Sequence, residues 1–135
     1  MPTTTAAFKL YSKDIVSQEL DVDISTPLYT AGTSTGISTF TGTIVTTLPS
    51  AGVPSAYKIA DEADYTDNKS AKIYIYNAAT ATADDYAIID LNSVVTGRLY
   101  PGDWCLFPYA GLVDVNITPK ANTAVKIEYC VLGNA

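Results

Sequence analysis

Apolar and polar residues alternate with a period of two through much of the second half of the chain. Between positions 113 and 117 three β-branched residues alternate with polar ones, and a similar alternation recurs between 125 and 131. This spacing directs the apolar side chains to one face of a β-strand and the polar ones to the other. Pro119 and Asn122, between the two runs, are typical of turns. The pattern therefore predicts a β-hairpin that joins 113–117 to 125–131.

Further segments rich in β-branched and aromatic residues precede this pair, and clusters containing proline or glycine separate them. They span residues 19–24, 37–45, 71–76, 86–91 and 103–109. No window of about 11 residues carries an uninterrupted apolar stripe of helical period. The best candidate for a single helical turn is Ile59–Tyr65. Roughly eight or nine short strands, about ten residues apart, predict an all-β fold, either an antiparallel β-sandwich or a jelly roll.

The domain organisation follows from the length of the chain. A chain of 135 residues is long enough to bury one hydrophobic core, so we expect a single β-sandwich domain over residues 1–135. Two segments depart from the strand pattern. Residues 1–7 and the Thr-, Ser- and Gly-rich stretch 30–47 are expected to form a flexible N-terminal arm and a flexible loop.

The charge of the chain excludes several classes of partner. The net charge is −6, the eight lysines and arginines are scattered, and there is no histidine. Nucleic acid is therefore not an expected partner, and the commonest general base and zinc ligand is missing. No apolar run approaches about 18 residues, and residues 1–8 lack the cationic and apolar parts of a signal peptide. We expect a protein made and retained in a cytoplasm, without a membrane partner.

Three short motifs resemble sites of chemistry, but their contexts favour structural roles. Gly32–Gly36 matches the G-x-S-x-G pattern of serine hydrolases without a histidine base. Residues 61–64 spell Asp-Glu-Ala-Asp, as in a helicase class, without the phosphate-binding loop. The acidic segment 61–68 offers oxygen ligands for calcium without the spacing of an EF-hand loop. We therefore predict no catalytic residues, no cofactor and no metal ligands.

The two cysteines of the chain, Cys105 and Cys130, allow two interpretations. A disulfide between them would close a loop of about 25 residues and stabilise the fold by roughly 3.5 kcal/mol. Two reduced and buried thiols are favoured for a protein retained in a cytoplasm.

The aromatic residues supply candidate interface positions. The chain has ten tyrosines and one tryptophan, and large amphipathic rings suit either a subunit interface or a sugar-stacking platform. Packing in the core or on a sheet face is the alternative role for the same residues. The interface candidates are Tyr74, Tyr76, Tyr100, Trp104 and Tyr109.

The C-terminal half of the chain resembles a known group of proteins. Leu99–Gly111 reads L-Y-P-G-D-W-C-L-F-P-Y-A-G, followed by V-D-V-N-I at Val113–Ile117 and V-K-I-E-Y at Val125–Tyr129. This order resembles small virion structural proteins of tailed bacteriophages, in which a strand with the pattern P-G-D-W-x-x-x-P precedes a turn and two closing strands. Lys72–Asn77 fits their aromatic strand that ends in asparagine. The resemblance covers about residues 70–133.

The resemblance implies a non-enzymatic capsid decoration (cement) protein, which binds the outer surface of the shell of the major capsid protein and stabilises it. It also implies a homo-oligomer, with a trimer as the expected state, located on the virion after assembly in the host cytoplasm. A tail-, neck- or fibre-associated component is the first alternative. A carbohydrate-binding or adhesion module is the second, and an enzyme that uses carboxylates alone is the third.

Overall fold

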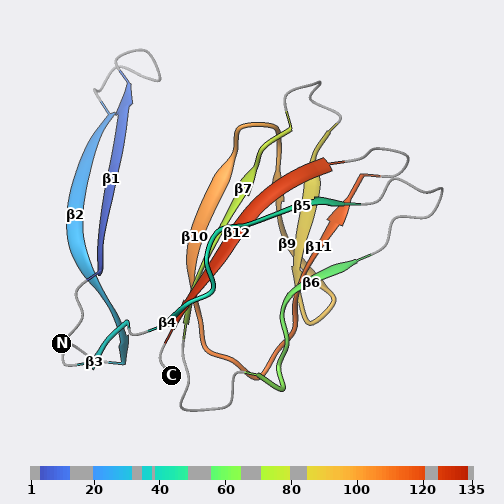
Figure 1. Ribbon diagram of the computed structural model, residues 1–135. Coiled ribbons are helices and arrows are strands. Elements are labelled where there is room, and N and C mark those ends of the chain that lie inside the picture. Colours follow the sequence, from blue (N-terminus) through green and yellow to red (C-terminus); the bar gives the residue numbers. More distant parts are fainter. Residues whose placement is uncertain are drawn as a thin grey trace.

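The computed structural model describes residues 4–12, 20–31, 35–37, 39–48, 56–64, 71–79, 85–120 and 125–133. These residues contain no helix and form twelve strand segments, two of which have only two residues (Figure 1). The strands are β1 (Thr4–Ser12), β2 (Leu20–Ala31), β3 (Thr35–Gly36), β4 (Thr39–Phe40), β5 (Ile44–Leu48), β6 (Tyr57–Ala60), β7 (Ala71–Asn77), β8 (Ala87–Leu91), β9 (Val94–Leu99), β10 (Trp104–Tyr109), β11 (Val115–Pro119) and β12 (Val125–Gly133).

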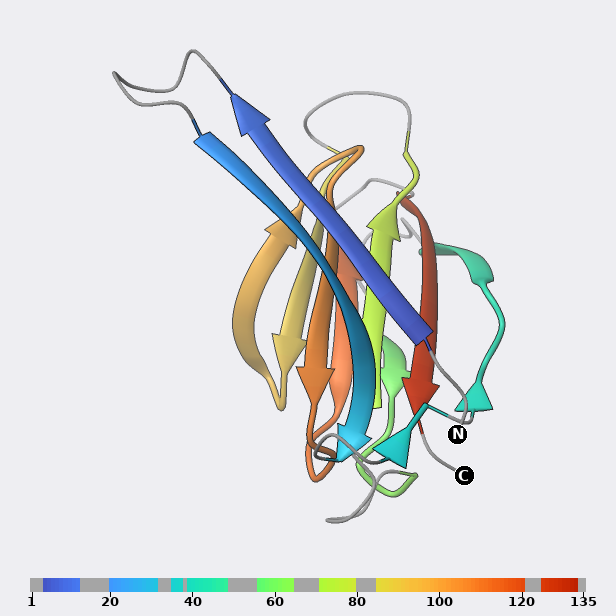
Figure 2. The ribbon, with the colours of Figure 1, turned by 90° about the vertical axis from the view of Figure 1, so that its left-hand side faces the viewer.

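Two antiparallel sheets form a β-sandwich, as the sequence predicts, although the strands outnumber the eight or nine expected. The first sheet has the order β10-β7-β12-β4, with β5 also paired to β12. The second has the order β6-β11-β8-β9. The two sheets lie as separate layers, with the first nearer the viewer in Figure 2. Their strands β10 and β9 end the two sheets on the same side of the sandwich, where they line one cavity.

The period of two in the sequence determines which side chains fill the space between the sheets. In β7 and β12 the inward residues alternate strictly with partly exposed ones over most of each strand. The largest fully buried apolar side chains come from both sheets and include Leu48, Ile73, Ile75, Val115, Ile117, Val125 and Ile127. These residues belong to one continuous hydrophobic cluster, which supplies most of the driving force for folding.

The predicted hairpin between 113–117 and 125–131 is wrong. Residues 115–117 and 125–131 form strands with the predicted faces buried, whereas the partly buried Val113 lies in a bend before β11. However, β11 pairs with β8 and β6, and β12 pairs with β7, β5 and β4. The chain therefore crosses from one sheet to the other between residues 119 and 125. Alternation of apolar residues fixes the face that a strand buries, but it carries no information about the neighbouring strand.

The segment proposed as a helical turn, Ile59–Tyr65, is also different in the structure. Its first two residues end strand β6 and are both buried, and a turn follows in which the Asp64 amide donates to the Asp61 carbonyl at 3.0 Å. The Asp-Glu-Ala-Asp motif is therefore part of an exposed turn between strands. Tyr65 lies outside the described residues.

A tight turn explains the P-G-D motif, which has no role in the core. In Tyr100–Asp103 the Asp103 amide donates to the Tyr100 carbonyl at 2.9 Å, with Pro101 second and Gly102 third at φ +89°. This is the arrangement of a type II turn, in which glycine tolerates the positive φ. The Asp103 carboxylate accepts a further hydrogen bond from the Tyr100 amide at 2.9 Å. The P-G-D sequence therefore has a local conformational cause.

The N-terminal part of the chain forms a long antiparallel hairpin, β1–β2, with register pairs from Thr4–Leu28 to Ser12–Leu20. In Figure 2 it crosses in front of the first sheet at an angle and continues past the upper ends of the strands. Residues 4–7, expected in a flexible arm, are the first residues of β1, and the expected loop 30–47 contains β3, β4 and most of β5.

Candidate interaction surface

The outer face of the first sheet is unusually rich in aromatic and apolar side chains. Strand β7 directs Tyr74 and Tyr76 outward, and the neighbouring β10 does the same with Trp104, Leu106 and Pro108. The strand register places Trp104 beside Tyr76 and Leu106 beside Tyr74. We call these five residues the aromatic face.

The hairpin β1–β2 is amphipathic, and one of its sides matches this face. Register pairs Phe8–Ile24 and Leu10–Val22 put four apolar side chains on one side, which we call the apolar side of the hairpin. The opposite side carries the pairs Lys9–Asp23 and Tyr11–Asp21. The apolar pairs and the charged pairs alternate along the hairpin because successive residues of a strand point to opposite sides.

The hairpin and the aromatic face touch through two aromatic rings. The Phe8 and Trp104 ring centroids are 5.7 Å apart with an interplanar angle of 69°, which is an edge-to-face contact. Coverage is nevertheless incomplete on both surfaces. Trp104 remains 49% exposed, and Leu10 and Ile24 on the hairpin remain 46% and 50% exposed. Contiguous exposed apolar residues of this kind mark sites of interaction with another molecule.

Charged residues lie around the aromatic face and not within it. Burial and the nearby Glu128 carboxylate raise the pKa of Tyr74, which stays neutral at physiological pH. Glu128 also pairs in register with Tyr76, so it borders the face on the side of β12. Lys72 borders it at the other end, opposite Pro108. The centre of the face is therefore neutral, and charged residues lie at its rim.

The structure brings together three of the five interface candidates. Tyr74, Tyr76 and Trp104 belong to the aromatic face. Tyr100 lies in the turn after β9, where its ring is 5.3 Å from that of Tyr86, and Tyr109 is only 3% exposed. The Tyr109 hydroxyl donates a hydrogen bond to the Val113 carbonyl, so this ring is part of the core rather than the surface.

Sequence reasoning missed the contribution of the hairpin and of Leu106. The alternation of Phe8 and Leu10 with polar residues was the available signal, but it spans few residues, directly after the segment 1–7 that is expected to be flexible. Segment 19–24 was identified as a strand, and the structure confirms Leu20–Ile24 as part of β2. Its partner strand could not be assigned from the pattern alone.

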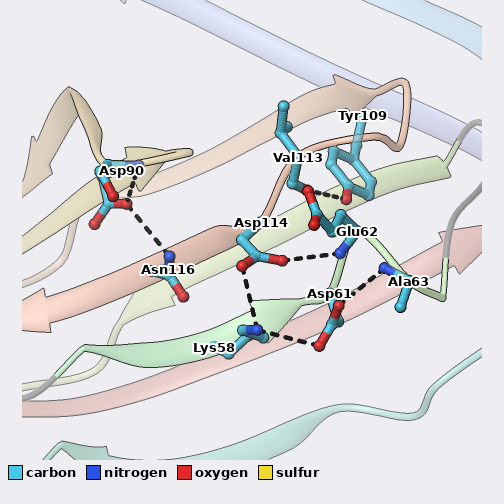
Figure 3. Close-up of polar contacts among 10 residues, drawn as sticks. Lys58, Asp61, Glu62, Ala63, Asp90, Tyr109, Val113, Asp114 and Asn116 are labelled. Carbon is cyan, nitrogen blue, oxygen red and sulfur yellow. Dashed lines mark hydrogen bonds and ion pairs between the residues drawn. The ribbon is translucent and has the colours of Figure 1, made fainter.

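A polar cluster separate from the aromatic face, drawn in Figure 3, joins β6 to the segment before β11. The Lys58 ammonium lies 3.1 Å from a carboxylate oxygen of Asp61 and 3.2 Å from one of Asp114. The remaining oxygens of these two carboxylates accept the amides of Ala63 and Glu62, each at 2.9 Å. The Ala63 amide and then Lys58 lower the pKa of Asp61, and the two carboxylates raise the pKa of Lys58.

This ion-pair cluster includes Asp61, which belongs to the segment considered for calcium. Asp61 uses its oxygens for Lys58 and for a backbone amide, an arrangement that stabilises the turn without a cation. Among the described residues there is no group of three or more His, Cys, Asp or Glu side chains placed to hold a metal ion. Asp67 and Asn68 lie outside the described residues, as do Gly32 to Ser34 of the G-x-S-x-G motif.

The two cysteines are free thiols. Cys105 pairs in register with Ile75 and Cys130 with Tyr74, so strand β7 lies between them and they point to opposite faces of the sheet. Two strand spacings amount to about 10 Å, which is too far for a disulfide. Burial raises the pKa of both thiols, which therefore carry little nucleophilic thiolate at neutral pH.

The sandwich is open between its edge strands β9 and β10, where a cavity of about 450 Å³ lies. Its lining is mostly apolar and comes from β8, β9 and β10, with Cys105 and Phe107 on one wall and Ile89 and Leu99 on the other. The cavity suits an apolar group. Arg98, which also lines it, lies with its guanidinium carbon 5.0 Å from the centre of the Tyr86 ring.

No family model, curated protein or solved structure matches this chain. Within the described residues there is no helix that could cross a membrane.

Proposed function

We propose that this chain is a non-enzymatic structural protein of a tailed-bacteriophage virion, and that it acts as a capsid decoration protein on the shell of the major capsid protein. The observation that carries the proposal is the half-covered aromatic face beneath an extended amphipathic hairpin. Tryptophan and tyrosine are enriched in protein interfaces, and charged residues are depleted from their centres. A protein whose task is to bind other subunits needs such a surface.

Two features of the sequence support the same role. The order of motifs over about residues 70–133 resembles small phage virion proteins. The net charge of −6 suits a position on the outside of a particle, where no contact with packaged DNA is required. Many identical copies on a shell also allow each individual contact to be weak.

Two alternatives follow from the same surface. A tail-, neck- or fibre-associated component would use it for a different virion partner and would be present in far fewer copies. A carbohydrate-binding module is favoured by the exposure of Trp104 next to Tyr76, because paired aromatic rings can stack against sugars.

Copy number in purified particles tests the proposal. Quantitative mass spectrometry of density-purified virions from the source lysate is expected to give a ratio of about one, or about one third, to the major capsid protein. A few to a few dozen copies per particle would move the assignment to the tail or neck. Absence from the particles would overturn the virion assignment.

A glycan titration separates the remaining alternative. The decoration role predicts co-sedimentation with mature shells and no response to glycans. Saturable glycan binding that Trp104→Ala abolishes and Val95→Ala preserves would favour the carbohydrate-binding module. Val95 is a suitable control because it is 66% exposed on β9, in the other sheet.

A further inference from the structure

We propose that the N-terminal hairpin is an exchange arm, whose apolar side covers the aromatic face of a second copy of this chain. The inference does not rest on the virion assignment, because it concerns the association of the chain with itself. Its starting point is that two apolar surfaces of one molecule are each left half uncovered.

The hairpin needs a packing partner. An isolated two-stranded hairpin is at best marginally stable in water, and stability comes from covering its apolar side. Phe8 meets Trp104, but the next apolar pair along the hairpin, Leu10 and Val22, lies further toward the end that extends past the sheet in Figure 2. Leu10 is 46% exposed, and Ile24, which is paired with Phe8, is 50% exposed.

The contact between Phe8 and Trp104 within one chain indicates which surface the hairpin can bind on a second copy. Phe8 packs on Trp104 of its own chain, so the two surfaces are complementary, and the same hairpin on a second copy can make the same contact. Within one molecule the link through β3, which pairs with the end of β2, restricts where the hairpin can lie on the sheet. A hairpin from another copy is free of this restriction and can cover Leu106 as well as Trp104.

The charged residues of the hairpin do not oppose its docking on a second copy. A chain of net charge −6 repels copies of itself, so an interface between copies must keep carboxylates out of its centre. The carboxylates of Asp21 and Asp23 lie on the opposite side of the hairpin from Phe8 and Leu10. Docking of the apolar side therefore buries neither of them.

The area of the surfaces indicates that the exchange is reciprocal. The paired length of about 30 Å and the width of two strands, about 10 Å, give roughly 300 Å² for one side of the hairpin. One docked hairpin then removes about 600 Å² from water over both partners, below the roughly 1,200 Å² of a stable interface. Two such contacts reach that value. Each copy must therefore give one hairpin and receive another, in a two-fold dimer or a closed ring.

Sedimentation equilibrium of the purified full chain tests the proposal. The wild type is expected to associate into a dimer or closed ring. Leu10→Asp on the hairpin and Leu106→Asp on the aromatic face should each weaken association at least about 30-fold, as a buried interface residue does. Val95→Asp, on an exposed valine of the second sheet, is the matched control and should leave association unchanged. All three positions are exposed, and far-UV circular dichroism checks that each variant is folded.

Cross-linking distinguishes exchange from the contact within one molecule. Chains carrying Leu10→Cys are mixed with chains carrying Leu106→Cys and oxidised, and a mixed disulfide dimer is expected. Leu10→Cys chains mixed with wild type control for Cys105 and Cys130 and should yield no such species.

Three results would overturn the proposal: a monomeric wild type at high concentration, association that neither aspartate variant weakens, or no mixed dimer. If the wild type is monomeric and Leu10→Asp abolishes binding to shells, the hairpin binds the capsid protein instead. If the chain exchanges hairpins but is absent from virions, the virion assignment fails while the exchange stands.

Discussion

Among the described residues, Asn77 is the polar side chain that is fully buried, and it joins three segments at one end of the sandwich. Its amide nitrogen donates to the carbonyls of Asp85 and Leu99, both at 2.9 Å, and its oxygen accepts the Ala79 amide at 2.9 Å. The asparagine that ends strand β7 therefore has a structural role. It satisfies the Leu99 carbonyl in a buried hydrogen bond, and the Asp85 carbonyl and the Ala79 amide in part-buried ones.

Replacement of Asn77 by alanine is expected to destabilise the fold by about 3 kcal/mol, because three hydrogen bonds are lost and the carbonyl of Leu99 is left unsatisfied in the interior. Urea denaturation measures this change. Asn116→Ala is the matched control, since the Asn116 amide makes a single long hydrogen bond of 3.4 Å to Asp90, and it should cost less than about 1 kcal/mol. Equal losses at the two positions would contradict the role given to Asn77.

Asn92 and Ser93, between β8 and β9, have φ values of 51° and 66°. Positive φ at both positions is typical of a type I′ turn, in which glycine is preferred at the second position. Ser93→Gly should therefore stabilise the protein by up to about 1 kcal/mol, seen as a higher thermal midpoint. Ser25→Gly, in strand β2 and without a positive φ, should give no gain. A lower midpoint for Ser93→Gly would exclude backbone strain at this turn.

The ion pairs of Lys58 predict a pH dependence of stability. The pKa of Asp61 is lowered in the folded state, so its contribution is present above the unfolded pKa of about 3.8 and is lost as the pH falls through the folded value. The raised pKa of Lys58 gives a contribution that is lost only in strong alkali. Thermal midpoints measured between pH 2.5 and 6 should fall less steeply for Lys58→Met than for wild type. If the thermal midpoints of the two proteins fall in parallel with pH, the ion pairs of Lys58 do not cause the pH dependence.

At the scale of the elements, the buried face of β12 connects the first sheet to the core. Ile127 is fully buried, and Val45 on the neighbouring strand β5 is 52% exposed. Ile127→Ala should cost about 2–5 kcal/mol, because it leaves a cavity in the core, whereas Val45→Ala should cost well under 1 kcal/mol. Chemical denaturation of the two variants measures the difference. A loss below 1 kcal/mol at Ile127 would mean that the other face of the strand is buried.

The elements also show what the sequence can predict. The strands at 71–77, 115–119 and 125–133 and their buried faces follow from a period of two, which depends only on local residues. The pairing of these strands depends on residues far apart in the chain, and a five-residue connection suits either a hairpin or a crossing between sheets. The three interface candidates that share one face of the first sheet lie on the regular strand β7 or at the start of β10. The hairpin was missed because its partner strand had too short a pattern.

At the scale of the whole molecule, β12 lies inside the first sheet, paired on one side with β7 and on the other with β5 and β4. It follows all of these partners in the chain. During synthesis on the ribosome, the hairpin β1–β2 can form early from local contacts, but the first sheet has no central strand until β12 has left the exit tunnel. Stalled nascent chains ending at residue 124 are therefore expected to be digested by protease throughout the sandwich, and chains extended well beyond residue 133 should become resistant in a single step.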